Sequence, residues 1–117
     1  MTKYERAAQL CSVLALAARN RQVLTYDIVA RVVGVPRPAL GGFLAPIQAH
    51  CIQNSLPPLT ILVVSEQTGL PGKGFIGTED IPKAQIGVFS YDWIAHGSPA
   101  VHDFETSDQA SLTNSAK

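Results

Sequence analysis

The sequence predicts an α+β fold in which helices dominate, and three features lead to that prediction. Apolar residues recur at helical spacing in three successive segments, over residues 3–20, 25–33 and 38–54. A turn rich in glycine and proline separates the second segment from the third. The run Leu-Thr-Ile-Leu-Val-Val over residues 59–64 has the β-branched, apolar character of a strand. The expected order is therefore helix, helix, turn, helix and strand.

The first expected helix, over residues 3–20, has one apolar face. The residues of that face follow the i, i+3, i+4, i+7 rhythm of a buried stripe and are Ala7, Leu10, Cys11, Leu14 and Ala17. Arg19 and Arg21 come at the C-terminal end, where the helix dipole stabilises positive charge. These two arginines therefore have a structural explanation beside any role in binding.

The boundaries of the second helix are marked by its end residues. Thr25 is a favoured N-cap, Asp27 places negative charge in the first turn, and Gly34 suits a left-handed C-cap. Pro38 then opens the third helix, because its missing N–H is not needed in a first turn. The two helices are thus joined by a short turn.

The third helix, over residues 38–54, contains two unusual features. Gly41 and Gly42 each lower the helix propensity by about 1 kcal/mol, so we expect close approach to their backbone by the preceding helix or by a ligand. Pro46 removes a hydrogen bond from the helix interior, which predicts either a bend or two successive helices.

A β-hairpin is expected after the third helix. The strand over residues 59–64 precedes turn residues over 66–72, and residues 73–76 form a short return strand. Helix, helix, turn, helix and then hairpin is the order of a helix-turn-helix with a β-hairpin wing. The sequence thus predicts an α+β, mainly α, winged-helix-like fold.

The rest of the chain is expected to close this domain and then to become disordered. A helix begins at residues 78–80 and continues to Phe89. Three apolar residues after it are expected to anchor the chain on the core: Tyr91, Trp93 and Ile94. We expect a single winged-helix-like domain over residues 1–97 and a flexible polar tail over residues 98–117, where apolar residues are few.

The charge of the chain is balanced overall but divided along its length. The formal net charge is zero. Residues 1–75 carry seven basic and three acidic side chains, a balance of +4, and residues 76–117 carry two basic and six acidic ones, a balance of −4. This division predicts a basic face and an acidic C-terminal part.

Composition and spacing disfavour several classes of function. No apolar run approaches the roughly 18 residues that span a bilayer. Cys11 and Cys51 fall on apolar helix faces, where we expect reduced core thiols and hence a cytoplasmic location. The histidines show no metal-ligand spacing, and no catalytic triad or phosphate-binding loop is present. We expect no enzymatic activity, no cofactor, no metal and no membrane association.

Several short motifs between residues 23 and 75 resemble one known family. They are Leu24-Thr25-Tyr26, Ile28-Val29-Ala30, Gly34-Val35-Pro36, Ala39-Leu40-Gly41-Gly42-Phe43-Leu44, Val63-Val64 and the segment from Gly69 to Phe75. Together they resemble the C-terminal DNA-binding domain of alkylguanine-DNA alkyltransferases and of the alkyltransferase-like proteins. The resemblance covers a little under half of the chain and implies a winged-helix, DNA-binding scaffold.

The chain departs from this family at the active site. The family carries Pro-Cys-His-Arg directly before the paired valines, where this chain has Leu-Thr-Ile-Leu over residues 59–62. Without the cysteine and its histidine, alkyl transfer to a thiolate is excluded. The family's duplex-inserting arginine corresponds to Pro38, and the adjacent Arg37 is a candidate substitute.

Two functions of different class follow from these observations. The first is a non-enzymatic protein that binds duplex DNA, in a regulatory or DNA-structure-sensing role. Its expected nucleic-acid-binding residues are Arg19, Arg21, Arg31, Arg37, Gly41, Gly42 and Lys73. The alternative is a protein-protein interaction or inhibitor module on the same scaffold. Net neutrality, Pro38 and the apolar wing tip of Leu70 and Pro71 favour that alternative.

Overall fold

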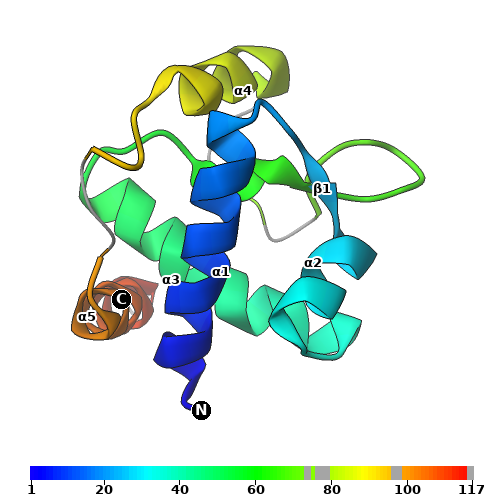
Figure 1. The fold of residues 1–117 in the computed structure, drawn as a ribbon. Coiled ribbons are helices and arrows are strands. Elements are labelled where there is room, and N and C mark those ends of the chain that lie inside the picture. The colour runs from blue at the N-terminus through cyan, green and yellow to red at the C-terminus, as the bar shows by residue number, and fades with distance from the viewer. Residues whose placement is uncertain (73–74, 76–79, 96–98, 116–117) are drawn as a thin grey trace.

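The computed structural model describes residues 1–72, 75, 80–95 and 99–115. Helices dominate these residues, and two short strands accompany them, so the expected α+β, mainly α, class is confirmed (Figure 1). The α-helices are α1 (Lys3–Arg19), α2 (Tyr26–Val33), α3 (Leu40–Gln53), α4 (Ile81–Ser90) and α5 (Val101–Ser115). The strands are β1 (Leu24–Thr25) and β2 (Val63–Val64), and the 3-10 helices are η1 (Arg37–Ala39) and η2 (Leu59–Leu62).

Local capping fixes the start of α1. The hydroxyl of Thr2 accepts a 3.2 Å hydrogen bond from the backbone N–H of Glu5, and the Glu5 carboxylate accepts one of 3.2 Å from the backbone N–H of Thr2. This capping box satisfies two N–H groups at the helix start. The face behind it is buried at Ala7, Leu10, Leu14, Ala17 and Ala18, which confirms the expected stripe except that Cys11 is only partly buried.

The strand expected over residues 59–64 is largely a 3-10 helix. Only Val63 and Val64 are extended, and they pair in parallel with Leu24 and Thr25 of β1. Residues 59–62 follow a pair of prolines, and the N–H of Ile61 donates to the carbonyl of Pro58 at 3.0 Å. All four residues of η2 are buried. Their apolar character therefore reflects burial in the core and not strand pairing.

Of the hairpin expected over residues 59–76, the described residues contain only a turn and one isolated bridge. Val64 forms an isolated antiparallel bridge with Pro71, and the N–H of Ser65 donates to the carbonyl of Leu70 at 2.9 Å. Of the expected return strand, Phe75 is not in a strand, and residues 73, 74 and 76 lie outside the described residues.

Helix α3 runs unbroken through Pro46, so the alternative of two successive helices was wrong. The residue four before Pro46 is Gly42, which is exposed, so water can satisfy the carbonyl that loses its intrahelical partner. The helix also starts later than expected, because Pro38 lies in η1 and not in α3.

The C-terminal residues are not the flexible tail that was expected. Residues 101–115 form α5, which packs against α1 and α3, with Phe104, Ser107 and Asp108 buried. The side-chain amide of Gln53 donates to the carbonyl of Ser107 at 2.6 Å. The composition-based prediction failed because one buried aromatic ring and a few polar contacts to distant residues hold this helix.

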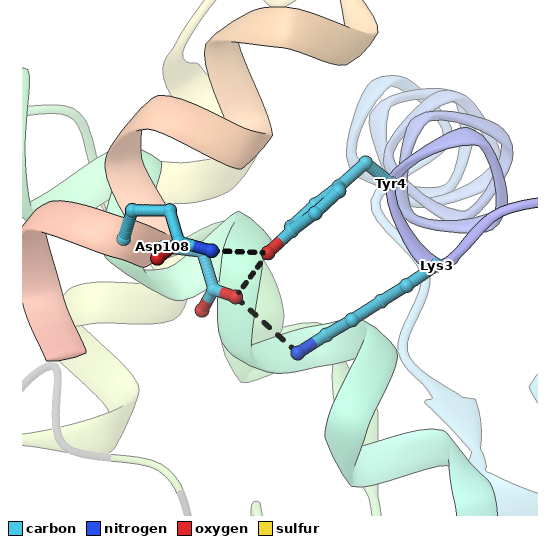
Figure 2. Close-up of polar contacts among 4 residues, drawn as sticks. Lys3, Tyr4 and Asp108 are labelled. Atoms are coloured by element: carbon cyan, nitrogen blue, oxygen red, sulfur yellow. Dashed lines mark hydrogen bonds and ion pairs between the residues drawn. The ribbon is translucent and has the colours of Figure 1, made fainter.

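Asp108 is the central polar contact of α5 (Figure 2). Its carboxylate accepts hydrogen bonds from the Tyr4 hydroxyl at 2.9 Å and from the Lys3 ammonium at 3.2 Å. Both partners lie in the first turn of α1. The start of α1 is thereby joined to the last helix of the chain.

The expected helix after residue 80 is confirmed as α4, with Asp80 as its N-cap. Trp93 partly fulfils the expected anchoring role, since it packs on the core and its indole N–H donates to the carbonyl of Val88 at 2.9 Å. Ile94 does not, because 62% of its surface is exposed.

No individual helix among the described residues is long and apolar enough to cross a bilayer. Tyr26–Val33 and Arg37–Gln53 meet the criterion only when taken together, and they are bent by 93° relative to each other.

Candidate nucleic-acid interface

Helices α2 and α3 meet at a sharp corner. The axes of Tyr26–Val33 and Arg37–Gln53 differ by 93°, and only residues 34–36 separate them. Gly34 ends α2 in the left-handed conformation, with φ 74° and ψ 37°, and its N–H donates to the carbonyl of Ala30. A left-handed residue is inexpensive for glycine, so the tight corner follows directly from this residue. We call the exposed part of this segment, from Arg31 to Ala45, the α2–α3 corner.

Arg37 lies on this corner and is held against the first turn of α2. One guanidinium nitrogen lies 3.4 Å from the Asp27 carboxylate, and the guanidinium carbon lies 5.9 Å from the centre of the Tyr26 ring. The Arg37 side chain remains 54% exposed. Since a guanidinium has five N–H donors, donors remain for an external acceptor.

An arginine outside the corner contacts the end of α2, and this contact was not predicted. The guanidinium of Arg6, on α1, donates to the carbonyl of Val33 at the end of α2. This carbonyl is among the last of its helix and has no intrahelical partner. Sequence reasoning missed the contact because it joins residues 27 positions apart, and no local pattern marks it.

The two glycines of the corner are open to solvent. A Cβ built at Gly41 or Gly42 meets no heavy atom within 4 Å, and both residues are exposed. The preceding helix therefore does not approach this backbone closely, and that part of the expectation was wrong. Ala45 lies one turn further along α3 and is also exposed. The N-terminal half of α3 thus presents uncovered backbone.

The predicted cations do not all gather on this corner. Arg31 and Arg37 lie on either side of the 34–36 turn, and both are exposed. Arg19 lies at the opposite end of α1 from Arg6, about 20 Å away at 1.5 Å per residue. It pairs with Asp92 at 3.8 Å. Arg21 follows it, also exposed. The arginines therefore form two groups, and Lys73 lies outside the described residues.

A small cavity of about 170 Å³ lies beside the corner, with Tyr26, Gly41 and Thr60 among its walls. Thr60 is 6% exposed, and its hydroxyl is a buried polar atom without a hydrogen-bond partner among the described residues. An unpaired buried hydroxyl costs about 1–3 kcal/mol.

Comparison with known proteins returned no matching family model, no matching curated protein and no matching solved structure. In the part of the chain that the structure describes, no three His, Cys, Asp or Glu side chains gather closely enough to hold a metal ion. The geometry of the corner is therefore the main basis for a proposal about function.

Proposed function

We propose that this protein is a non-enzymatic duplex DNA-binding protein of winged-helix type that places the α2–α3 corner in a groove. The observation that carries the proposal is the 93° angle between two helices joined by only residues 34–36. Helix-turn-helix pairs cross at about 90–120° with a turn of three or four residues, often containing glycine. The second helix of such a pair contacts base edges with its N-terminal residues.

The exposure of the corner supports the same proposal. Arg37, Gly41 and Gly42 are all exposed at the start of the second helix. The C-terminal half of α3 instead packs against α5, through His50 and Gln53. Arginines at this position provide contacts to phosphates or to guanine edges. Glycines without a side chain allow the DNA backbone to approach the helix closely. The resemblance to alkyltransferase-like proteins implies the same scaffold.

Fluorescence polarisation with a labelled 20-base-pair duplex at about 50 mM salt tests this proposal, since phosphate contacts are strongest at low salt. We expect Arg31→Ala and Arg37→Ala to weaken binding, and Arg19→Ala and Arg21→Ala to weaken it less, because these arginines lie at the other end of α1. All four side chains are exposed, so the variants should fold. Absence of binding to any duplex, or equal losses from both pairs, would refute the proposed interface.

A protein-interaction module remains the second candidate function, and exposed apolar residues favour it. Leu70, in the turn after β2, is 51% exposed, and Ile28 and Val32 on the outer face of α2 are 44% and 59% exposed. If DNA binding is absent, a pull-down with the unmodified chain should capture a protein partner, and nuclease treatment should not release it. Leu70→Asp should release that partner if the turn is the contact.

A further inference from the structure

A larger cavity lies away from the α2–α3 corner, against the other half of α3. It has a volume of about 510 Å³ and lies between α1, the C-terminal half of α3 and four residues further along the chain, Tyr91, Trp93, Pro99 and Asp103. Small-molecule sites in proteins usually occupy about 300–1,000 Å³. The cavity is therefore large enough to hold a small organic molecule.

Its walls are mainly apolar and include a pair of aromatic rings. Tyr91 and Trp93 lie with their ring centres 4.6 Å apart and their planes inclined by 60°, and both line the cavity. Ile47 and Leu59 contribute aliphatic surface from α3 and η2. The faces of aromatic rings are electron-rich and attract cations.

The charge of the described lining residues has one sign. Asp103, near the start of α5, is the one carboxylate among them, and no lysine or arginine of the described residues joins it. One of its oxygens accepts a 2.8 Å hydrogen bond from the N–H of Ala100, and no described residue donates a hydrogen bond to the other oxygen. His50 also lines the cavity, and burial lowers the pKa of its imidazole, which favours its neutral form. A cationic guest therefore meets a carboxylate, and no lysine or arginine among the described lining residues repels it.

From this combination we propose that the cavity binds a small organic amine, whose apolar body fills the space and whose ammonium group lies near Asp103 and the Tyr91–Trp93 pair. The carboxylate and the aromatic faces both stabilise positive charge. A carboxylate ligand of the same size would be repelled by Asp103. A neutral ligand of that shape would gain only the apolar contacts.

The first test uses the unmodified protein. Trp93 is the single tryptophan of the chain, so its fluorescence reports directly on this cavity. We expect 2-phenylethylamine to change the fluorescence in a saturable way at low salt, and to bind more tightly than 2-phenylethanol and phenylacetate. Equal affinity for the three compounds, or no saturable change with the amine, overturns the proposal.

The second test places the charge. In Asp103→Asn, the side-chain oxygen can still accept the hydrogen bond from the Ala100 N–H, as asparagine does at helix caps. The variant should weaken amine binding by about two- to fivefold, which is the range for an exposed ion pair. Glu105→Gln is the matched control, because Glu105 lies on the same helix, is exposed and does not line the cavity. An equal loss in both variants overturns the role of Asp103. Neither outcome depends on DNA binding, because the cavity lies away from the α2–α3 corner.

Discussion

The hydroxyl of Tyr4 donates a 2.9 Å hydrogen bond to the carboxylate of Asp108 across 104 residues of sequence. The Lys3 ammonium contacts the same carboxylate oxygen at 3.2 Å, and the Asp108 side chain is only 6% exposed. A buried carboxylate is tolerated only when it is hydrogen-bonded or paired. The start of α1 and the middle of α5 therefore stabilise each other.

The first prediction concerns this contact. Tyr4→Phe retains the ring but removes one donor from a buried carboxylate, so it should lower the free energy of unfolding by about 1–2 kcal/mol. Lys3→Met should cost less, about 0–1 kcal/mol, because the Lys3 side chain is 45% exposed and its ion pair is screened by water. Urea unfolding of both variants measures the difference. A larger cost for Lys3→Met contradicts the assignment of the hydroxyl as the main partner.

The second prediction concerns His50, which packs against Phe104 with ring centres 5.4 Å apart. Burial lowers the pKa of His50 from its ordinary value of 6.5, and Asp103 acts in the opposite sense with a smaller effect. The folded state thus favours the neutral imidazole. Neutral His50 therefore makes its full contribution to the free energy of unfolding above pH 6.5. This contribution is lost as the pH falls from 6.5 through the lowered pKa.

Unfolding measured by urea between pH 8 and pH 5 should therefore show a decline in stability below pH 6.5. His50→Gln should reduce that decline, and His102→Gln, at an exposed position of α5, should leave it unchanged. Identical pH profiles for the His50 variant and the unmodified chain would rule out this origin for the decline.

The third prediction concerns the two thiols. Burial raises the pKa of Cys11 to about 12 and also raises the pKa of Cys51. The thiolate is the reactive form, so iodoacetamide at pH 8 should label both cysteines more slowly in the folded protein than in urea, and Cys11 by more than about a hundredfold. Mass spectrometry over time measures both rates. Rapid labelling of the folded protein would show that α1 and α3 open readily.

The fourth prediction separates stability from binding at Gly41. Gly41→Ala should raise the free energy of unfolding by about 0.5–1 kcal/mol, because the helix gains propensity and the new Cβ meets nothing within 4 Å. The same change should weaken duplex binding if DNA approaches this backbone. Gly87→Ala in α4 is the matched control, since Gly87 is also exposed and unobstructed. It should stabilise the chain to a similar extent and leave DNA affinity unchanged.

Elements defined by neighbouring residues could be predicted from the sequence. Thr25 and Gly34 mark the ends of α2 by local chemistry, and the structure has the N-cap and the left-handed C-cap at these positions. The buried face of α1 follows from periodicity alone. Of the predicted site, Arg31, Arg37, Gly41 and Gly42 are exposed on the two helices that meet at one short turn, because they are close along the chain.

Features that depend on distant residues could not be predicted. The apolar run over residues 59–64 fits a strand and a buried 3-10 helix equally well, and packing decides between them. Residues 101–115 are poor in apolar groups, and their helix depends on partners such as Tyr4 at the other end of the chain. The separation of Arg19 from Arg37 likewise depends on how α1 packs.

The salt dependence of duplex binding tests the central proposal most directly. Each phosphate contact adds about −0.9 to the slope of log K against log salt concentration. We predict a slope of about −2 or steeper for the unmodified chain, and a slope shallower by about 2 for the double variant Arg31→Ala, Arg37→Ala. No measurable binding at low salt, or the same slope for both proteins, would contradict the proposal that the α2–α3 corner binds DNA.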